Sequence, residues 1–310
     1  MTNRPTSRRT VLECMAWAGA AAVWSFSGGV PRARLLGSPA HAEEASFSFA
    51  QISDSHIGFA KDANMDVPGT LQAAITQLGQ LPHHPSMVLH TGDVSHLSKP
   101  AQFDTAAQII GAGKFDIHYV PGEHDMLEDN GRPFIERFQA REKPGVAGGA
   151  CYSFDQNGVH FIGLNNVTDL KAGGLGMIGE AQLKWLAGDL AGRADSQPIV
   201  VFAHIPLWTV YAPWGWGTED GERALALLRR FGSVTVLNGH IHQVLQKVEG
   251  NVAFYSARST AFPQPAPGAA PSPGPMKVDA GKLRGVLGIR EVTVIAGQAA
   301  LAVADATLAG

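Results

Sequence analysis

Short apolar runs of strand length recur along the chain, and most of them end next to a potential metal ligand. They lie at 47–52, 87–89, 117–120, 159–164, 199–202 and 234–237. Between several of them, apolar positions repeat with the spacing of an amphipathic helix, at 68–81, 102–110, 180–190 and 220–231. Strands that alternate with helices predict an α/β fold with open sheets, whose strand carboxyl ends form a ligand crevice. Later strands are expected near 252–255 and 288–294.

Acidic and histidine motifs follow these runs. In chain order the motifs are Asp54-Ser55-His56, Gly92-Asp93, Gly122-Glu123-His124-Asp125, His204 and Gly239-His240-Ile241-His242. Each fragment alone is compatible with turn chemistry or with a helix N-cap. Asp and His suit Mn, Fe or Zn, and a set of two Asp and three or more His is enough to hold two ions. The set therefore predicts hydrolysis at a two-metal centre.

This ordered set resembles the calcineurin-like metallophosphoesterase family, whose motifs run D-x-H, G-D, G-N-H-D/E, H and G-H-x-H. The resemblance covers about residues 46–260. It implies an α/β fold of four layers, an α/β/β/α sandwich of two mixed sheets flanked by helices. It also implies two metal ions, Fe, Mn or Zn, as cofactors.

The resemblance assigns the ligands of the two ions. One site is completed by Asp54, His56 and His242, and the other by Glu123, His204 and His240. Asp93 follows a strand and a glycine that permits a tight turn, so its carboxylate can bridge both ions, with one oxygen to each. Bridging brings two ions to the separation of about 3.5–4 Å found in two-metal phosphatases.

By the same resemblance, His124 binds no metal but lies beside the substrate phosphate, where it stabilises charge or protonates the leaving oxygen. Histidine has a pKa close to neutral pH and serves as a general acid without large tuning. Asp125 is then expected to orient the His124 imidazole, as carboxylates do for histidines at metal sites. The implied mechanism is in-line attack by a metal-bridging hydroxide with His124 assisting, without a covalent enzyme intermediate.

Glu123 departs from the family pattern, which has a neutral Asn at this position. A glutamate adds a negative charge, so the centre would have three anionic protein ligands in place of two. We hypothesise that this favours a harder or trivalent ion such as Fe(III), because anionic oxygen ligands suit such ions. The alternatives are that Glu123 turns away and water fills its place, or that its charge weakens catalysis.

The first 42 residues do not have the pattern of a folded domain. Ser7-Arg8-Arg9-Thr10-Val11-Leu12 resembles a twin-arginine export signal, and an apolar run at 15–26 and the small-residue site Ala40-His41-Ala42 follow it. The run is shorter than the roughly 20 residues of a membrane-spanning helix. We predict a signal peptide at 1–42 for the twin-arginine export machinery and a metallophosphoesterase domain at 43–310, in the periplasm or secreted. An uncleaved amphipathic anchor is the alternative.

The net charge of the chain makes nucleic acid an unfavourable partner. The whole chain has a formal charge of −3, and loss of residues 1–42 removes five Arg and one Glu, which leaves the mature chain at about −7. An acidic chain without a basic run is a poor electrostatic partner for nucleic acid, so a small phosphate ester is the expected substrate.

Only Cys151 remains after cleavage. No internal disulfide can then form, and stability must come from the core of one large domain.

Two loops and one further histidine have more than one interpretation. The segment 262–275 contains six prolines and predicts an extended loop, either a connector or a lid. Ser259-Thr260 before it resembles a segment that lies near the substrate in the cyclic-nucleotide phosphodiesterase branch of the family. His96 can also approach the pocket. Aromatic residues after His204 either stack on the substrate or form a small satellite core: Trp208, Tyr211, Trp214 and Trp216.

The sequence is therefore interpreted as an exported dinuclear-metal phosphoesterase, with phosphodiester hydrolysis favoured over phosphomonoester hydrolysis. The preference for diesters rests on 239–243 and Ser259-Thr260. The alternatives are a phosphomonoesterase of the same fold, a nonspecific nuclease, and a metal-binding scaffold without turnover. His124 and Asp125 argue against a scaffold, which needs no proton donor, whereas Glu123 is its best support. The oligomeric state and the natural substrate do not follow from the sequence.

Overall fold

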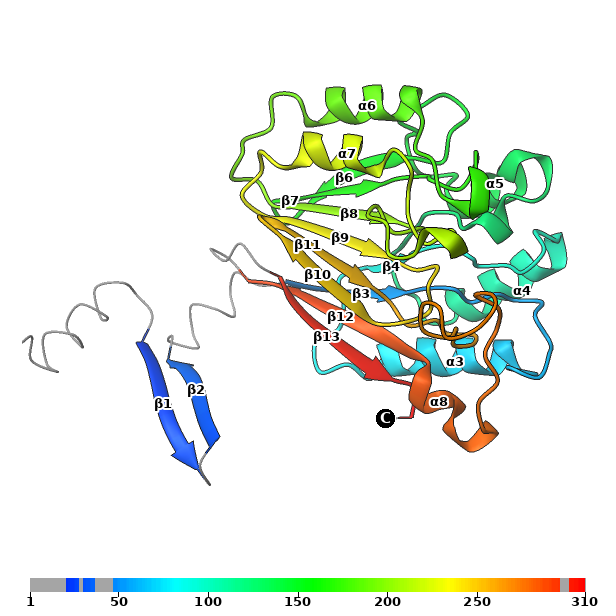
Figure 1. Cartoon of the computed structure of the whole chain (residues 1–310), viewed down its shortest axis with the longest axis horizontal. Coiled ribbons are helices and arrows are strands. Elements are labelled where there is room, and N and C mark those ends of the chain that lie inside the picture. The colour runs from blue at the N-terminus through cyan, green and yellow to red at the C-terminus, as the bar shows by residue number, and fades with distance from the viewer. Residues whose placement is uncertain (1–20, 28–29, 37–46, 296–300, 310) are drawn as a thin grey trace, which may run out of the picture. The chain divides into compact units, whose positions relative to one another are not determined.

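The structure is a computed structural model that describes residues 21–27, 30–36, 47–295 and 301–309 (Figure 1). The chain divides into two units, Met1–Ser46 and Phe47–Gly310. In the first unit, strand β1 (Ala21–Ser27) pairs antiparallel with β2 (Val30–Leu36). The predicted twin-arginine motif at 7–12 and the small-residue site at 40–42 lie outside the described residues, so the export signal stays a prediction. Within the described ranges, no helix is both long and apolar enough to cross a membrane.

Two mixed sheets form the centre of the second unit. The five-stranded sheet has the order β13-β12-β3-β4-β5, and the six-stranded sheet has the order β10-β11-β9-β8-β7-β6. The strands of the first are β3 (Phe47–Ile52), β4 (Val88–His90), β5 (Ile117–Tyr119), β12 (Gly288–Val294) and β13 (Ala302–Thr307). Those of the second are β6 (Tyr152–Gln156), β7 (Val159–Gly163), β8 (Ile199–Ala203), β9 (Val234–Asn238), β10 (Leu245–Glu249) and β11 (Val252–Ser256). The central strands of both sheets are parallel, and antiparallel strands complete each sheet.

Helices cover the outer faces of both sheets, which gives four layers (Figure 1). Buried side chains such as Leu71 and Phe103 join the five-stranded sheet to its helices, which are α3 (Val67–Leu78), α4 (Pro100–Gly111) and α5 (Arg132–Phe138). Leu186 and Leu225 do the same for the six-stranded sheet, covered by α6 (Glu180–Leu190) and α7 (Gly221–Leu228). A short helix, α8 (Leu283–Val286), precedes β12. The predicted α/β/β/α fold class is confirmed.

A third apolar core fills the space between the two sheets. It includes Phe49 and Leu89 from one sheet and Phe161, Phe202 and Leu237 from the other. Helices cover the outside and this core covers the inside, so every residue of β8 and β9 is buried. This two-sided burial explains why the central strands appear in the sequence as continuous apolar runs.

One buried charged side chain crosses between the sheets. Arg290 on β12 is fully buried. It donates two hydrogen bonds to Asp305 on the neighbouring β13, both at 3.0 Å, and one of 2.9 Å to the carbonyl oxygen of Ser256 in the other sheet. It also donates to Gln51 Oε1 at 3.1 Å, and the Gln51 amide donates in turn to Thr91 Oγ1 at 3.0 Å. The chain of hydrogen bonds thus runs from the edge of the five-stranded sheet to the loop that carries Asp93.

Candidate metal centre

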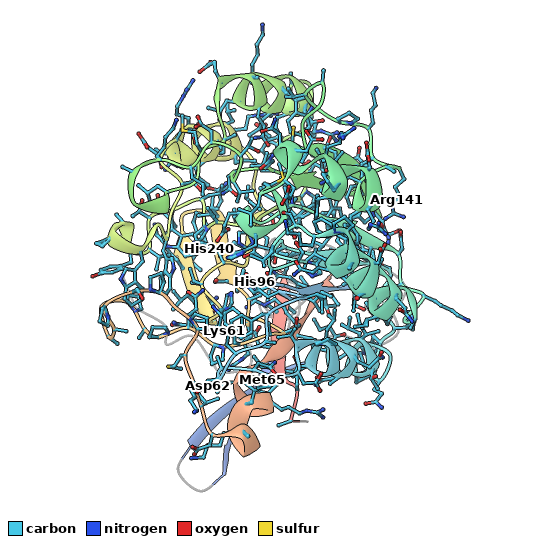
Figure 2. All side chains as sticks on the ribbon, turned by 90° about the vertical axis from the view of Figure 1, so that its right-hand side faces the viewer. Lys61, Asp62, Met65, His96, Arg141 and His240 are labelled. Atoms are coloured by element: carbon cyan, nitrogen blue, oxygen red, sulfur yellow. The ribbon has the colours of Figure 1, made fainter. Side chains whose placement is uncertain are left out.

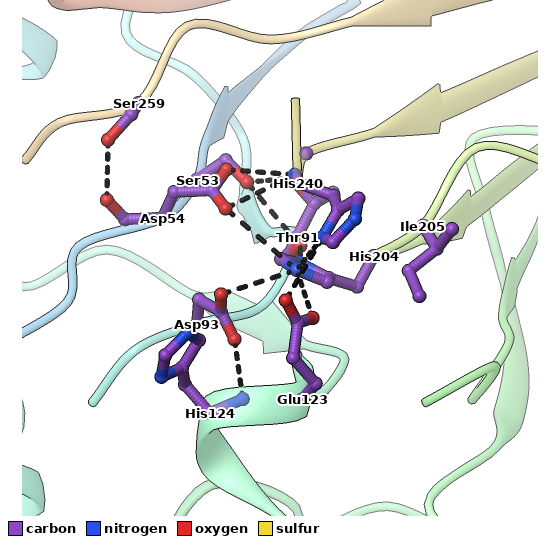
Figure 3. Close-up of polar contacts among 12 residues, drawn as sticks. Ser53, Asp54, Thr91, Asp93, Glu123, His124, His204, Ile205, His240 and Ser259 are labelled. Carbon is purple, nitrogen blue, oxygen red and sulfur yellow. Dashed lines mark hydrogen bonds and ion pairs between the residues drawn. The ribbon is translucent and has the colours of Figure 1, made fainter. Parts of the chain in front are cut away.

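All seven predicted ligands lie on loops at the carboxyl ends of parallel strands. Those from the five-stranded sheet follow β3, β4 and β5, and those from the six-stranded sheet follow β8 and β9. The two sheets pack face to face, so these five loops meet at one end of the sandwich. The structure therefore brings together Asp54, His56, Asp93, Glu123, His204, His240 and His242. Figure 3 labels Asp54, Asp93, Glu123, His204 and His240 among them.

The backbone at this centre has an unusual conformation. Five of the predicted ligands have a positive φ: Asp54 at 54°, His56 at 42°, Asp93 at 53°, His240 at 67° and His242 at 51°. Non-glycine residues adopt this region rarely and at a cost of about 1–3 kcal/mol each, so the surrounding structure must hold them there. Backbone hydrogen bonds do so, from Asp54 N to Gly92 O at 3.0 Å and from His56 N to Asp93 O at 2.8 Å.

The first ligand set consists of Asp54, His56 and His242, all at most 2% exposed. His242 Nε2 lies 3.2 Å from Asp54 Oδ1 and 3.3 Å from His56 Nε2. The other ring nitrogen of His242, Nδ1, lies 2.6 Å from the carbonyl oxygen of Phe262 and must carry the proton, because a carbonyl can only accept. This contact leaves the lone pair of His242 Nε2 directed into the centre, as a metal ligand requires.

The second set consists of Glu123, His204 and His240. The Glu123 carboxylate lies 2.9 Å from His204 Nε2 and 3.1 Å from His240 Nδ1. His204 Nδ1 donates to the carbonyl oxygen of Thr91 at 2.7 Å, so its Nε2 also faces the centre. The alternative in which Glu123 turns away from the site is wrong, since its side chain reaches both histidines.

Asp93 lies between the two sets, but in a different way from the predicted one. Its Oδ2 is 3.5 Å from His56 Nε2 and 3.4 Å from His204 Nε2, while its Oδ1 accepts the backbone N–H of His124 at 2.9 Å. The expectation of one oxygen for each ion is therefore corrected. A single oxygen faces both sets, because the amide occupies the other.

The donor set fits two cations. Three carboxylates and four imidazoles converge here, and lone-pair nitrogens of different residues lie 3.3 Å apart in each set. Such nitrogens repel one another unless a proton or a cation lies between them. Burial disfavours a charged His204, but the charges of Asp93 and Glu123 outweigh it and raise the His204 pKa well above its usual range. The protein thus concentrates negative potential where positive ions would bind.

His124 lies at the edge of this centre, and its ring is held by a backbone group. Its Nδ1 donates to the carbonyl oxygen of His96 at 2.7 Å. Burial lowers the pKa of His124, but the charges of Asp93 and Glu123 oppose this and give a net rise. The second ring nitrogen, Nε2, is then the atom from which a proton can be given.

The expected role of Asp125 is wrong, because its carboxylate does not contact the His124 ring. It accepts hydrogen bonds from the backbone N–H groups of Val94 at 3.0 Å, Ser95 at 2.8 Å and Gly122 at 3.1 Å, and from Ser95 Oγ at 3.0 Å. Burial and the nearby Asp93 charge raise the Asp125 pKa to about 7, against the effect of these donors. Asp125 therefore joins the two loops that carry Asp93 and His124.

The two loops with open interpretations also contact the centre. Phe262, the first residue of the proline-rich segment, stacks on His56 with ring centroids 4.7 Å apart, and the Ser259 hydroxyl donates to the carbonyl oxygen of Asp54 at 2.8 Å. Trp214 and Trp216 are buried against Ile241, between the two histidines of the last motif. These two tryptophans form the satellite core, so their stacking on a substrate is excluded.

His96 is the residue at this centre whose place the sequence left open. Its ring stacks on His124 with centroids 4.8 Å apart, and its Nδ1 lies 3.4 Å from His56 Nδ1. Burial and the His124 charge lower its pKa to about 4. Figure 2 labels both His96 and His240 on the face turned to the viewer. The feature of the sequence that indicated this placement was the position of His96, three residues after Asp93.

The fold and the two ligand sets together place this chain in the class of metal-dependent hydrolases. A family model described as Calcineurin-like phosphoesterase matches residues 47–244. The chain belongs to this family, and it is a metal-dependent phosphoric ester hydrolase.

Named relatives and solved structures agree with this assignment. A 3',5'-cyclic-nucleotide phosphodiesterase of Nostoc sp. is 25% identical over 227 residues, which cover 71% of this chain and 80% of that protein. A glycerophosphodiester phosphodiesterase of Enterobacter lignolyticus is 26% identical over 208 residues, 63% of this chain and 70% of that protein. A dimetal phosphatase from Danio rerio shares the fold with a TM-score of 0.57 at 17% identity, covering 83% of this chain and 98% of its own.

Proposed function

We propose that this chain is a dinuclear-metal phosphodiesterase for small phosphodiesters, with His124 as the proton donor. The observation that carries the proposal is the position of Asp93, whose Oδ2 faces both ligand sets while its Oδ1 binds the His124 amide. The names of the two relatives support diesters over monoesters. A phosphomonoesterase and a metal-binding scaffold are the alternative functions.

Each group of the chain has a separate task in this proposal. Asp54, His56 and His242 would hold one ion, Glu123, His204 and His240 the other, and Asp93 both. When bound, such ions supply Lewis acidity and lower the pKa of coordinated water. The His124 ring is held by the hydrogen bond that its Nδ1–H donates to the His96 carbonyl oxygen. Its Nε2 is therefore free to give a proton to the departing oxygen.

The test compares bis-p-nitrophenyl phosphate with p-nitrophenyl phosphate, using residues 43–310 loaded with Mn, Fe, Zn or Co. A higher kcat/KM for the diester supports the proposal, and a preference for the monoester supports a phosphatase. Two bound ions with no turnover of either ester, or of glycerophosphodiesters and cyclic nucleotides, would favour the scaffold. Metal content is measured on the same samples.

Glu123 is expected to decide which ion the second set prefers. Its charge adds to those of Asp54 and Asp93, and we propose that this favours a harder or trivalent ion. The Glu123→Asn variant should then lose Fe(III) relative to Zn when both are offered, as measured by elemental analysis. Unchanged metal ratios would contradict the charge argument. Glu142→Gln, at a carboxylate that contacts His118 outside the site, is the matched control.

We also propose export by the twin-arginine route, on the basis of residues 7–12. Replacing Arg8 and Arg9 by lysine should leave the full-length chain in the cytoplasm, whereas the unchanged sequence should direct it to the periplasm. Cell fractionation followed by immunoblotting measures the distribution. Equal amounts in the periplasm for both sequences would rule out this route.

A further inference from the structure

His96 contacts a predicted metal ligand and the predicted proton donor at the same time. Its imidazole Nδ1 lies 3.4 Å from His56 Nδ1, and its carbonyl oxygen accepts from His124 Nδ1 at 2.7 Å. The partly buried ring packs edge-on against Phe59, with centroids 5.3 Å apart, and stacks on His124. One residue on the Asp93 loop therefore joins both halves of the proposed chemistry.

The proton between the two Nδ1 atoms can be assigned from the surroundings of His56. The other nitrogen of His56, Nε2, faces Asp93 Oδ2 at 3.5 Å and His242 Nε2 at 3.3 Å, where a ligand atom must present a lone pair. His56 then carries its proton on Nδ1 and donates it, so His96 Nδ1 is the acceptor. Histidines that bind metals commonly have their second nitrogen held in this way, and the partner fixes the ring orientation.

The main chain of His96 is fixed independently of its side chain. Asp125 binds the amides of Val94 and Ser95 before it, and Ser98 Oγ after it donates to the carbonyl oxygen of His124 at 2.8 Å. The carbonyl contact to His124 should therefore survive replacement of the His96 side chain. This separation allows the imidazole to be tested alone.

We propose that His96 is a positioning residue whose imidazole accepts a hydrogen bond from His56 and so sets the affinity of the Asp54, His56 and His242 site for its ion. The inference rests on the proposed two-metal function. Loss of such a supporting partner typically costs about 10–100-fold in metal affinity. The expected effect lies in ion binding at one of the two sites.

Two variants separate the hydrogen bond from packing. His96→Phe keeps a ring against Phe59 and His124 but removes the acceptor, whereas His96→Asn places an amide oxygen near the position of Nδ1. We expect His96→Phe to bind one of its two ions about 10–100-fold more weakly in chelator competition and His96→Asn to bind both as the unchanged protein does. The exposed His83→Phe serves as the control.

Metal-to-protein ratios and the visible absorption of the Co(II)-loaded protein provide the readout, both without substrate. Unchanged affinity in His96→Phe, or an equal loss in both variants, would overturn the proposal. If His96→Phe does not fold, the test uses His96→Asn and His96→Leu instead. We then expect His96→Asn to retain its ion affinity and His96→Leu to lose it. His56→Ala identifies the affected ion. If the unchanged protein binds two ions but hydrolyses no ester, the proposed function fails while the role of His96 can still hold.

Discussion

Replacing His124 by alanine is expected to lower kcat for phosphodiester hydrolysis by about 10²–10⁴-fold, the usual contribution of a positioned general acid. The hydrogen bond from His124 to Asp93 is donated by the backbone N–H, which alanine retains, so both ions should remain bound. The loss should be larger for an alkyl leaving group than for p-nitrophenolate, because a poor leaving group depends more on protonation. Steady-state kinetics on both diesters, with elemental analysis of each sample, measure these effects.

The exposed His83→Ala is the matched control for this substitution and should leave kcat unchanged. Two results would contradict the assignment of His124. One is a kcat within about threefold of the unchanged protein, far below the loss expected for a general acid. The other is a fall in kcat that follows a fall in bound metal, which would place His124 among the metal ligands.

Replacing Arg290 by methionine is expected to lower the free energy of unfolding by about 1–3 kcal/mol for each buried acceptor that is left without a donor, namely Gln51 Oε1 and the Ser256 carbonyl oxygen. Asp305 would lose two hydrogen bonds, and the carbonyl oxygen of Ser256 and Gln51 Oε1 one each. Urea denaturation of the metal-free protein at neutral pH measures the change, since bound ions would add their own stabilisation.

Two further variants define what the Arg290 result means. Arg284→Met, at an exposed arginine on α8, should change stability by no more than about 0.5 kcal/mol. Adding Asp305→Leu to Arg290→Met should change the loss by less than about 1 kcal/mol, because the Asp305 side chain is 23% exposed and water can solvate its unpaired carboxylate. A single-variant loss below about 1 kcal/mol would show that water or a rearranged side chain replaces these contacts.

Periodicity predicted the central elements well because helices and the inter-sheet core bury both faces of those strands. The expected strands at 47–52 and 288–294 and the helix at 180–190 have the observed bounds. β6, β10 and β13 were not predicted. They are edge strands whose side chains are largely exposed or half-exposed, so their sequences lack an apolar run. The short helix α5 was missed for a related reason, as seven residues give too little periodicity.

The order of the motifs located the candidate ligands, but it could not show which atoms they use. That Asp93 presents one oxygen to both sets depends on the backbone N–H of His124, which lies in another loop. The misassigned role of Asp125 has the same origin. Its partners are amide groups, which every residue has and no motif records. Contacts made by the main chain are therefore the part of this site that a sequence does not report.

The left-handed backbone at five of the predicted ligands also bears on whether folding precedes metal binding. Contacts within the chain hold these conformations, such as those of Asp54 and His56 to the Asp93 loop. The backbone of these ligand loops therefore has support from within the chain in addition to any bound ion. We expect folding and metal uptake to be separable steps, so that a folded chain would acquire its ions from the compartment it has reached.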